Sequence, residues 1–185
     1  MMKNIIIAVL LAGVIGLLAG VPFVFAQTPD GGTKISTENL SAIAKTRIRS
    51  SPSDAFNAFA DANQMSKFWF TRRDDGLKEG ETSTWFIGTG EHAFSFNVRV
   101  KEVNYPNKIV IEWENGGEYT QVTWTFEETE DGHTILGIEE SGFTGSSESI
   151  VDRVINSTGG FNQVIIAAKA LIERGVELNV VADHA

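Results

Sequence analysis

The sequence predicts an α+β fold in which a curved antiparallel sheet wraps around a long C-terminal helix. Two observations support this prediction. Apolar and polar residues alternate in a series of segments between residues 82 and 140, and an amphipathic helical pattern follows over residues 158–174. A sheet closed by one long helix often leaves a hollow between the two layers. This architecture therefore favours ligand binding over a particular reaction.

Composition limits the possible functions. The chain has 185 residues, of which 42% are hydrophobic, enough for one domain with a substantial core. Its 15 lysines and arginines are outnumbered by 24 acidic residues, and no basic cluster is present, so nucleic acid is not an expected partner. The absence of cysteine excludes disulfides and Cys-ligated metal sites. No histidine pair has metal-ligand spacing, and no motif indicates a cofactor.

The amino terminus predicts export. An apolar run over residues 5–26 follows Lys3, Pro22 interrupts it near its end, and Ala26 offers a small residue for cleavage before Gln27. We therefore expect residues 1–26 to be a signal peptide and the protein to be extracytoplasmic, either secreted or periplasmic. The alternative is an uncleaved membrane anchor, because an apolar run of this length can span a bilayer. That segment would be the only membrane contact.

The rest of the chain divides into three parts. Residues 27–40 are polar and contain a Pro-Asp-Gly-Gly sequence, which is typical of a flexible linker. Residues 41–176 show neither a repeat nor a change of composition, so we expect one folded domain. Residues 177–185 are expected to form a tail. The oligomeric state is left open.

The domain is predicted to begin with a strand and two short helices. Residues 41–50 give a moderate strand signal. Ser51 can cap a helix, Pro52 suits its first position, and Asp54 favours its positive end. A short helix with apolar residues over 55–59 should follow, and a second one over residues 62–68.

The middle of the domain is predicted to be an antiparallel meander. The alternating segments are residues 82–87, 94–101, 109–114, 120–126 and 134–138, and the turns between them include residues 105–107, 115–117 and 131–132. The expected order of elements is therefore β-α-α-β-β-β-β-β-α, with the helices covering one face of the sheet.

The closing helix over residues 158–174 has a clear apolar face. This face consists of Phe161, Val164, Ile165, Ala168, Leu171 and Ile172. Ile166 alone interrupts the polar face. Gly175 follows as a C-cap, because glycine readily adopts the left-handed conformation found there.

The order of these elements and several short motifs resemble the START-like, helix-grip (SRPBCC) superfamily. Within it the chain is most similar to the branch named after the activator of heat-shock-protein-90 ATPase. The similar segments are residues 51–56, 68–71, 100–103, 105–110, 133–136, 141–143, 160–161 and 171–175, together with Trp113. They extend over nearly the whole domain.

The resemblance implies a helix-grip fold with a cavity for an apolar ligand. It implies no particular substrate, because the superfamily includes binding proteins, cyclase-like enzymes and other functions. Two features depart from the family. Gly160-Phe161 stands where Gly-Trp is common, and an export signal is atypical of a family named after a cytosolic co-chaperone activity.

The domain is rich in large aromatic residues. Such rings can simply fill the core, but apolar ligand sites are lined by the same residue types. We expect the following residues to line a cavity: Trp69, Trp85, Phe96, Trp113, Trp124, Phe161 and Ile165.

Glu140 is the candidate polar residue of the site. Alternation places it on the same side as Thr134, Leu136 and Ile138, so it can point toward the closing helix. A carboxylate in that position would be desolvated and could bind a polar ligand group or act as a general acid or base. Alternatively, Glu139 and Glu140 both lie at a strand end and are solvated.

Three functions remain open. The leading one is an exported protein that binds a small hydrophobic molecule between the sheet and the C-terminal helix. The second is an enzyme of cyclase or hydrolase type on the same scaffold, with Glu140 as its weak catalytic candidate. The third is a chaperone-interacting protein. Because no catalytic constellation is present, the sequence favours binding over catalysis.

Overall fold

The computed structural model describes residues 37, 39–70, 72–73, 76–88, 93–115 and 117–182. They belong to a compact unit that extends from Ser36 to Ala185. The predicted signal peptide, residues 1–26, lies outside the described residues, as does nearly all of the predicted linker. In the described ranges, no helix is both long and apolar enough to cross a membrane.

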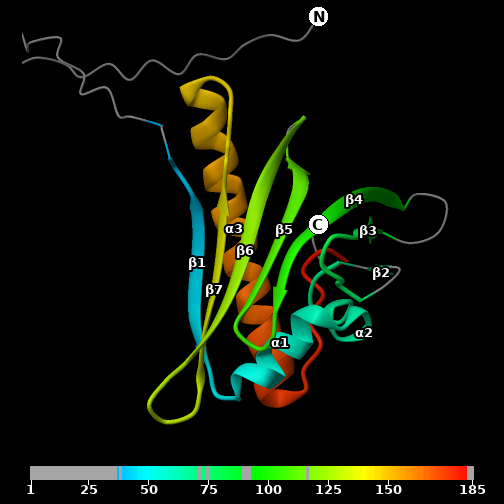
Figure 1. Cartoon of the computed structure of the whole chain (residues 1–185), viewed down its shortest axis with the longest axis vertical. Coiled ribbons are helices and arrows are strands. Elements are labelled where there is room, and N and C mark those ends of the chain that lie inside the picture. The colour runs from blue at the N-terminus through cyan, green and yellow to red at the C-terminus, as the bar shows by residue number, and fades with distance from the viewer. Residues whose placement is uncertain are drawn as a thin grey trace, which may run out of the picture. The chain divides into compact units, whose positions relative to one another are not determined.

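One antiparallel sheet forms the body of the domain (Figure 1). Its seven strands have the order β1-β7-β6-β5-β4-β3-β2. The strands are β1 (Ala42–Ile48), β2 (Arg72–Arg73), β3 (Thr82–Ile87), β4 (Phe94–Asn104), β5 (Lys108–Asn115), β6 (Glu118–Glu128) and β7 (Thr134–Ser141). The meander is confirmed, and the two-residue strand β2 is an addition that the alternation of the sequence did not reveal.

Three helices accompany the sheet, namely α1 (Pro52–Ala60), α2 (Ala62–Met65) and α3 (Ser147–Arg174). The start of α1 follows the prediction, because the Ser51 hydroxyl accepts a hydrogen bond from the Asp54 amide at 3.2 Å. The end of α3 does so too, since Gly175 adopts a left-handed conformation with φ of 67°.

The start of α3 differs from the prediction. The helix begins at Ser147 rather than at residue 158, and Ser146 caps it by accepting a hydrogen bond from the Ser149 amide at 3.2 Å. The run of Asn, Ser, Thr and two Gly over residues 156–160 has low helix propensity, yet it lies within the helix. Ile150 is buried and Val154 packs against the core, and this tertiary contact keeps the first half helical.

The core lies between the sheet and its helices. α3 runs along one face of the sheet, where it contacts β1, β7 and α1 (Figure 1). Trp85 and Trp124 are fully buried and stack on each other with ring centres 6.2 Å apart. Phe59 packs against Trp124 from α1. This part of the layer is therefore filled by aromatic rings.

The chain after α3 returns to the region that follows α2. Asn179 donates a hydrogen bond to the Ser66 carbonyl at 2.6 Å, and the Val180 amide donates to the Phe68 carbonyl at 3.4 Å. Glu177 pairs with Lys67 at 3.3 Å. The described part of the expected tail therefore packs on the domain.

Candidate functional site

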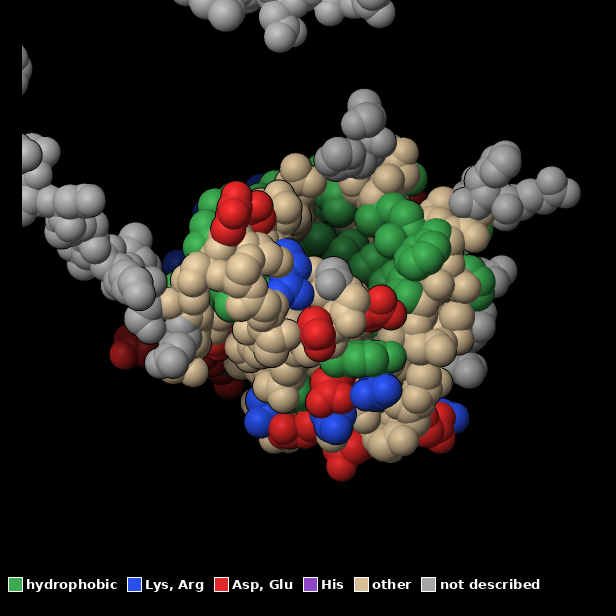
Figure 2. Space-filling view, turned by 90° about the horizontal axis from the view of Figure 1, so that it is seen from above, with side chains coloured by type: hydrophobic (Ala, Val, Ile, Leu, Met, Phe, Trp, Pro, Cys, Tyr) green, Lys and Arg blue, Asp and Glu red, His purple; other side chains and the backbone are tan. Residues whose placement is uncertain are grey.

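A pocket of about 930 Å³ opens between the middle of α3, the ends of β3 and β5, and the C-terminal segment after α3, which contributes Val180 and Val181. Seen from above, hydrophobic side chains gather in a hollow of the surface (Figure 2). α3 meets β1 closely on its other side, but here the strands diverge from it. The two layers therefore touch along part of the helix and separate along another part.

Three aromatic rings form a corner of the pocket. Trp113 and Phe161 are nearly parallel, with centres 6.1 Å apart and planes inclined by 13°. Trp69 stands almost perpendicular to both, at 5.9 Å from Trp113 and 6.2 Å from Phe161. A planar ligand group can stack on one wall of this corner while it meets the other wall edge-on, an arrangement that aromatic rings favour.

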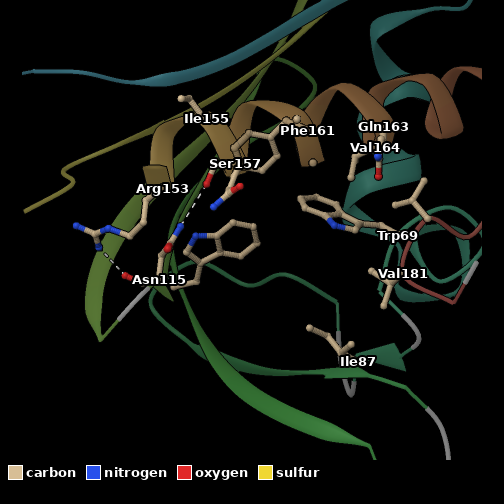
Figure 3. Close-up of a pocket in the computed structure, with 15 residues that line it drawn as sticks. Trp69, Ile87, Asn115, Arg153, Ile155, Ser157, Phe161, Gln163, Val164 and Val181 are labelled. Carbon is tan, nitrogen blue, oxygen red and sulfur yellow. Dashed lines mark hydrogen bonds between the residues drawn. The ribbon is translucent and has the colours of Figure 1, made fainter. Parts of the chain in front are cut away.

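Polar groups gather at one end of the pocket (Figure 3). Arg153 donates a hydrogen bond to the Asn115 carbonyl at 2.8 Å. The Asn115 side-chain amide in turn donates to the Ser157 hydroxyl at 3.3 Å. Asn156 lines the same end. The opposite end is mainly apolar, with Val164, Val181 and Ile87 around Trp69, and Gln163 is the polar side chain beside Val164.

Glu140 lies behind this wall. Its side chain is fully buried, and Oε1 accepts hydrogen bonds from the Trp113 indole at 2.8 Å, the Asn115 amide at 2.9 Å and the Thr120 hydroxyl at 2.5 Å. Its Oε2 atom is buried without a hydrogen-bond partner among the described residues. Of the two sequence interpretations, the inward orientation is therefore correct, while the neighbouring Glu139 is exposed.

The network around Glu140 fixes the pocket wall. A carboxylate can only accept hydrogen bonds, so the Asn115 amide nitrogen must face it and the indole N–H of Trp113 must point to it. Both Trp113 and Asn115 line the pocket, whereas Glu140 itself does not. In this conformation Glu140 orients pocket residues and has no surface toward a ligand.

The sequence-predicted site residues therefore separate into two groups. Trp69, Trp113 and Phe161 lie together at the pocket. Trp85, Trp124 and Ile165 are buried in the core, and Phe96 packs against Phe70, Trp85 and Trp113 without lining the pocket. Their ligand-binding role stays a prediction.

The sequence pattern did not reveal the residues at the polar end of the pocket. Arg153, Asn156 and Ser157 were not assigned to a helix, and Asn115 was interpreted only as part of a turn. The apolar spacing of Ile150, Val154 and Phe161 is the signal that could have extended the helix and brought these residues to the pocket.

Two neighbouring glycines, Gly159 and Gly160, also line the pocket from the middle of α3. A Cβ atom at either position would meet no protein atom within 4 Å. Packing in the described structure therefore does not require glycine at these positions.

Arg73 is a buried cation that belongs to the core. It donates hydrogen bonds to the carbonyls of Phe59, at 3.1 Å, and Ala60, and so binds the last carbonyls of α1. Burial lowers the pKa of its guanidinium to about 10, and the charge of Asp61 opposes that shift. In the described ranges no three His, Asp or Glu side chains are grouped to hold a metal ion.

Comparison with known proteins agrees with this fold. The family model described as Activator of Hsp90 ATPase homolog 1-like protein matches residues 49–170. No curated protein sequence is significantly similar to the chain.

Several solved structures are similar to it. A protein of Staphylococcus saprophyticus is 23% identical, with 75% of this chain and 96% of that chain covered and a TM-score of 0.62. One of Mesorhizobium loti is 17% identical, with 73% and 98% covered and a TM-score of 0.63. The Aha1 dimer of Colwellia psychrerythraea is 13% identical, with 74% and 98% covered and a TM-score of 0.59.

At these identities the solved structures establish the fold alone, whereas the family model covers most of the domain. It extends from the residues before α1 to the last turns of α3 and includes the whole meander. The chain thus belongs to the family of Activator of Hsp90 ATPase homolog 1-like proteins, a branch of the START-like superfamily.

Proposed function

We propose that this protein binds a small, largely apolar molecule in the pocket between α3 and the sheet. The observation that carries the proposal is the aromatic corner of Trp69, Trp113 and Phe161, which lines the pocket with Trp113 partly exposed and the other two rings buried beside it. The volume of about 930 Å³ is within the range of roughly 300–1,000 Å³ that is typical of small-molecule sites.

The filled core beside the pocket supports the same proposal. Trp85 and Trp124 already stabilise the domain where the helix meets the sheet. Trp113, by contrast, is only partly buried, so part of its ring remains available to a guest. An apolar ligand that covers it gains roughly 25 cal/mol for each Å² removed from water.

Fluorescence titration with N-phenyl-1-naphthylamine, a neutral apolar probe, tests the proposal. We expect its emission to rise on binding and tryptophan emission to be quenched. Trp113→Leu should weaken binding about tenfold or more, since it removes a stacking wall. Tyr119→Leu is the matched control, because Tyr119 is an exposed aromatic residue that does not line the pocket. Equal affinity of both variants and the wild type would contradict the proposal.

Catalysis is the second candidate, and one observation favours it. Glu140 is an inward-facing carboxylate beside the polar groups of Asn115 and Thr120. A general acid or base must reach its substrate, however, and Trp113 and Asn115 stand between Glu140 and the pocket. This arrangement supports binding over catalysis.

We further propose that the domain is exported, with residues 1–26 as its signal peptide. The apolar run after Lys3 and the small residue Ala26 support this assignment. Mass spectrometry of the protein from its native source should find a mature chain that starts at Gln27. An intact amino terminus in the membrane fraction would indicate an anchor instead.

A further inference from the structure

We infer that the ligand of this pocket is an amphiphile whose anionic head group binds Arg153 while its apolar body lies in the aromatic corner. This inference rests on the proposed function and specifies the chemical class of the ligand. Its starting point is the polarity of the pocket, which has Arg153, Asn115 and Ser157 at one end and Trp69 and Val181 at the other (Figure 3).

Arg153 differs from most cations of the domain in its partners. Lys45, Arg47, Arg49, Lys108 and Lys169 are among those that pair with carboxylates in the described structure. Arg153 forms no such pair in the same part of the chain, and it binds two carbonyl oxygens instead. Within the described ranges its positive charge is therefore without a direct counter-ion, although the chain carries a net charge of −9.

The guanidinium group is held in place before any ligand arrives. It binds the Asn115 carbonyl at 2.8 Å and the Thr144 carbonyl, and it lies over the Phe143 ring at 5.5 Å from the ring centre. A guanidinium has five N–H donors, and these two bonds use one on each terminal nitrogen. Each terminal nitrogen keeps a second N–H, which leaves donors for an anionic group.

The neighbouring groups suit a negatively charged head group. Ser157 and Asn156 lie on the same helix as Arg153 and line the same end of the pocket. Glu140 is the acidic residue bound to this wall, and it is fully buried behind Trp113 and Asn115. Three donors converge on its Oε1 atom, and Trp113 and Asn115 separate this atom from the pocket.

Two probes with the same ring system test the inference. 8-Anilinonaphthalene-1-sulfonate carries an anionic group, and N-phenyl-1-naphthylamine is its neutral counterpart. Arg153→Gln should lower the affinity for the anionic probe about tenfold and change that for the neutral probe by less than about twofold. Arg99→Gln is the control for net charge, because Arg99 is exposed on β4 and does not line the pocket.

A second measurement needs no variant. Raising the salt concentration from 50 to 500 mM should weaken binding of the anionic probe to the wild-type protein and should not weaken binding of the neutral one. Competition of two carboxylic acids with the anionic probe then identifies the kind of apolar body that the site accepts. Dodecanoate represents a fatty acid, and 2-naphthoate represents an aromatic acid. Displacement of the anionic probe by either acid supports the inference.

The outcomes separate this inference from the proposed function. Equal losses for both probes in Arg153→Gln would assign Arg153 a purely structural role and overturn the inference. So would the absence of any salt dependence, or the failure of both acids to compete. If the wild-type protein binds neither probe, the proposed function itself is wrong.

Discussion

At the residue scale, Glu140 connects the sheet to the wall of the pocket. Its Oε1 atom accepts hydrogen bonds from three side chains on two other strands, β5 and β6. If the acceptor is removed, the buried donors lose their partner, and an unsatisfied buried donor costs about 1–3 kcal/mol. Glu140 therefore stabilises the domain and orients Trp113 and Asn115 at once.

Two substitutions at Glu140 distinguish the contribution of its hydrogen-bond acceptor to stability from the contribution of its side-chain volume. Glu140→Leu keeps a similar volume but removes the acceptor, so we expect the free energy of unfolding to fall by about 3 kcal/mol. Glu140→Gln keeps a carbonyl oxygen for the three donors and should lower it by about 1 kcal/mol. Urea denaturation measures both values. Equal losses in the two variants would show that the hydrogen bonds to Oε1 contribute little.

Only part of this arrangement could be predicted from the sequence. Alternation in β7 indicates that Glu140 shares a face with Leu136 and Ile138, and that face is buried. Its partners are 20 to 27 residues away, and which of them meet it depends on the register of three strands. Sequence alternation specifies a face, but it does not specify register.

At the element scale, α3 lines the pocket with its middle, from Arg153 to Val164, and packs in the core with residues such as Ala167 and Ala168. Gly159 and Gly160 are among the lining residues, and glycine in a helix interior costs about 1 kcal/mol relative to alanine. Neither glycine has a positive φ, so alanine fits the backbone at both positions. The open space beside them is the space that we assign to the ligand.

Gly160→Ala should therefore have opposite effects on stability and on binding. We expect the melting temperature to rise, because stability increases by about 0.5–1 kcal/mol. We expect affinity for N-phenyl-1-naphthylamine to fall, since the added methyl group extends into the pocket. Asn162→Ala is the control on an exposed part of α3 outside the pocket. A stabilised Gly160→Ala protein with unchanged affinity would place the ligand elsewhere.

Also at this scale, an ionic network joins the end of β1 to the end of α3. Glu173 accepts a hydrogen bond from the Arg49 amide at 2.7 Å and pairs with Lys169 and the Arg49 side chain. Burial alone would raise the pKa of Glu173. The hydrogen bonds from Lys169 and the Arg49 amide, together with the positive charges of the Lys169 and Arg49 side chains, outweigh this effect of burial. They hold the pKa of Glu173 below its ordinary value of 4.5.

This shift predicts a dependence of stability on pH. A carboxyl group whose pKa is lower in the folded state stabilises the fold above its unfolded pKa, and this contribution is lost as pH falls through the folded pKa. Glu173→Gln should therefore be less stable than the wild type at pH 7, and the difference should shrink below about pH 4.5. Glu118→Gln, at an exposed position without an ion pair in the described structure, is the control. A difference that does not change with pH would contradict the assignment.

At the scale of the whole molecule, the sequence predicted the fold better than the pocket. Period-2 alternation and a helical stripe are local signals, and they suffice for the meander and for the closing helix. They do not indicate at which residues of α3 the helix and the sheet separate. Trp85 and Trp113 show the same alternation in their strands, yet Trp85 is fully buried and Trp113 lines the pocket.

The C-terminal segment is the clearest case of a contact without a local signal. Val180 and Val181 line the pocket although they lie beyond the last helix, and Asn179 holds them by its bond to Ser66. Asn179 also accepts hydrogen bonds from the Val181 and Ala182 amides, which form a turn. The segment therefore completes one wall of the pocket.

A chain that ends at Leu178 tests this role. We expect it to keep the fold and to unfold at a slightly lower temperature, because Val180 and Val181 are only partly buried. Its affinity for N-phenyl-1-naphthylamine should fall several-fold, since one apolar wall is missing. A chain that ends at Ala182 retains every described contact of the segment and should bind as the full chain does. If the shorter chain binds equally well, the ligand is held by the helix and the sheet alone.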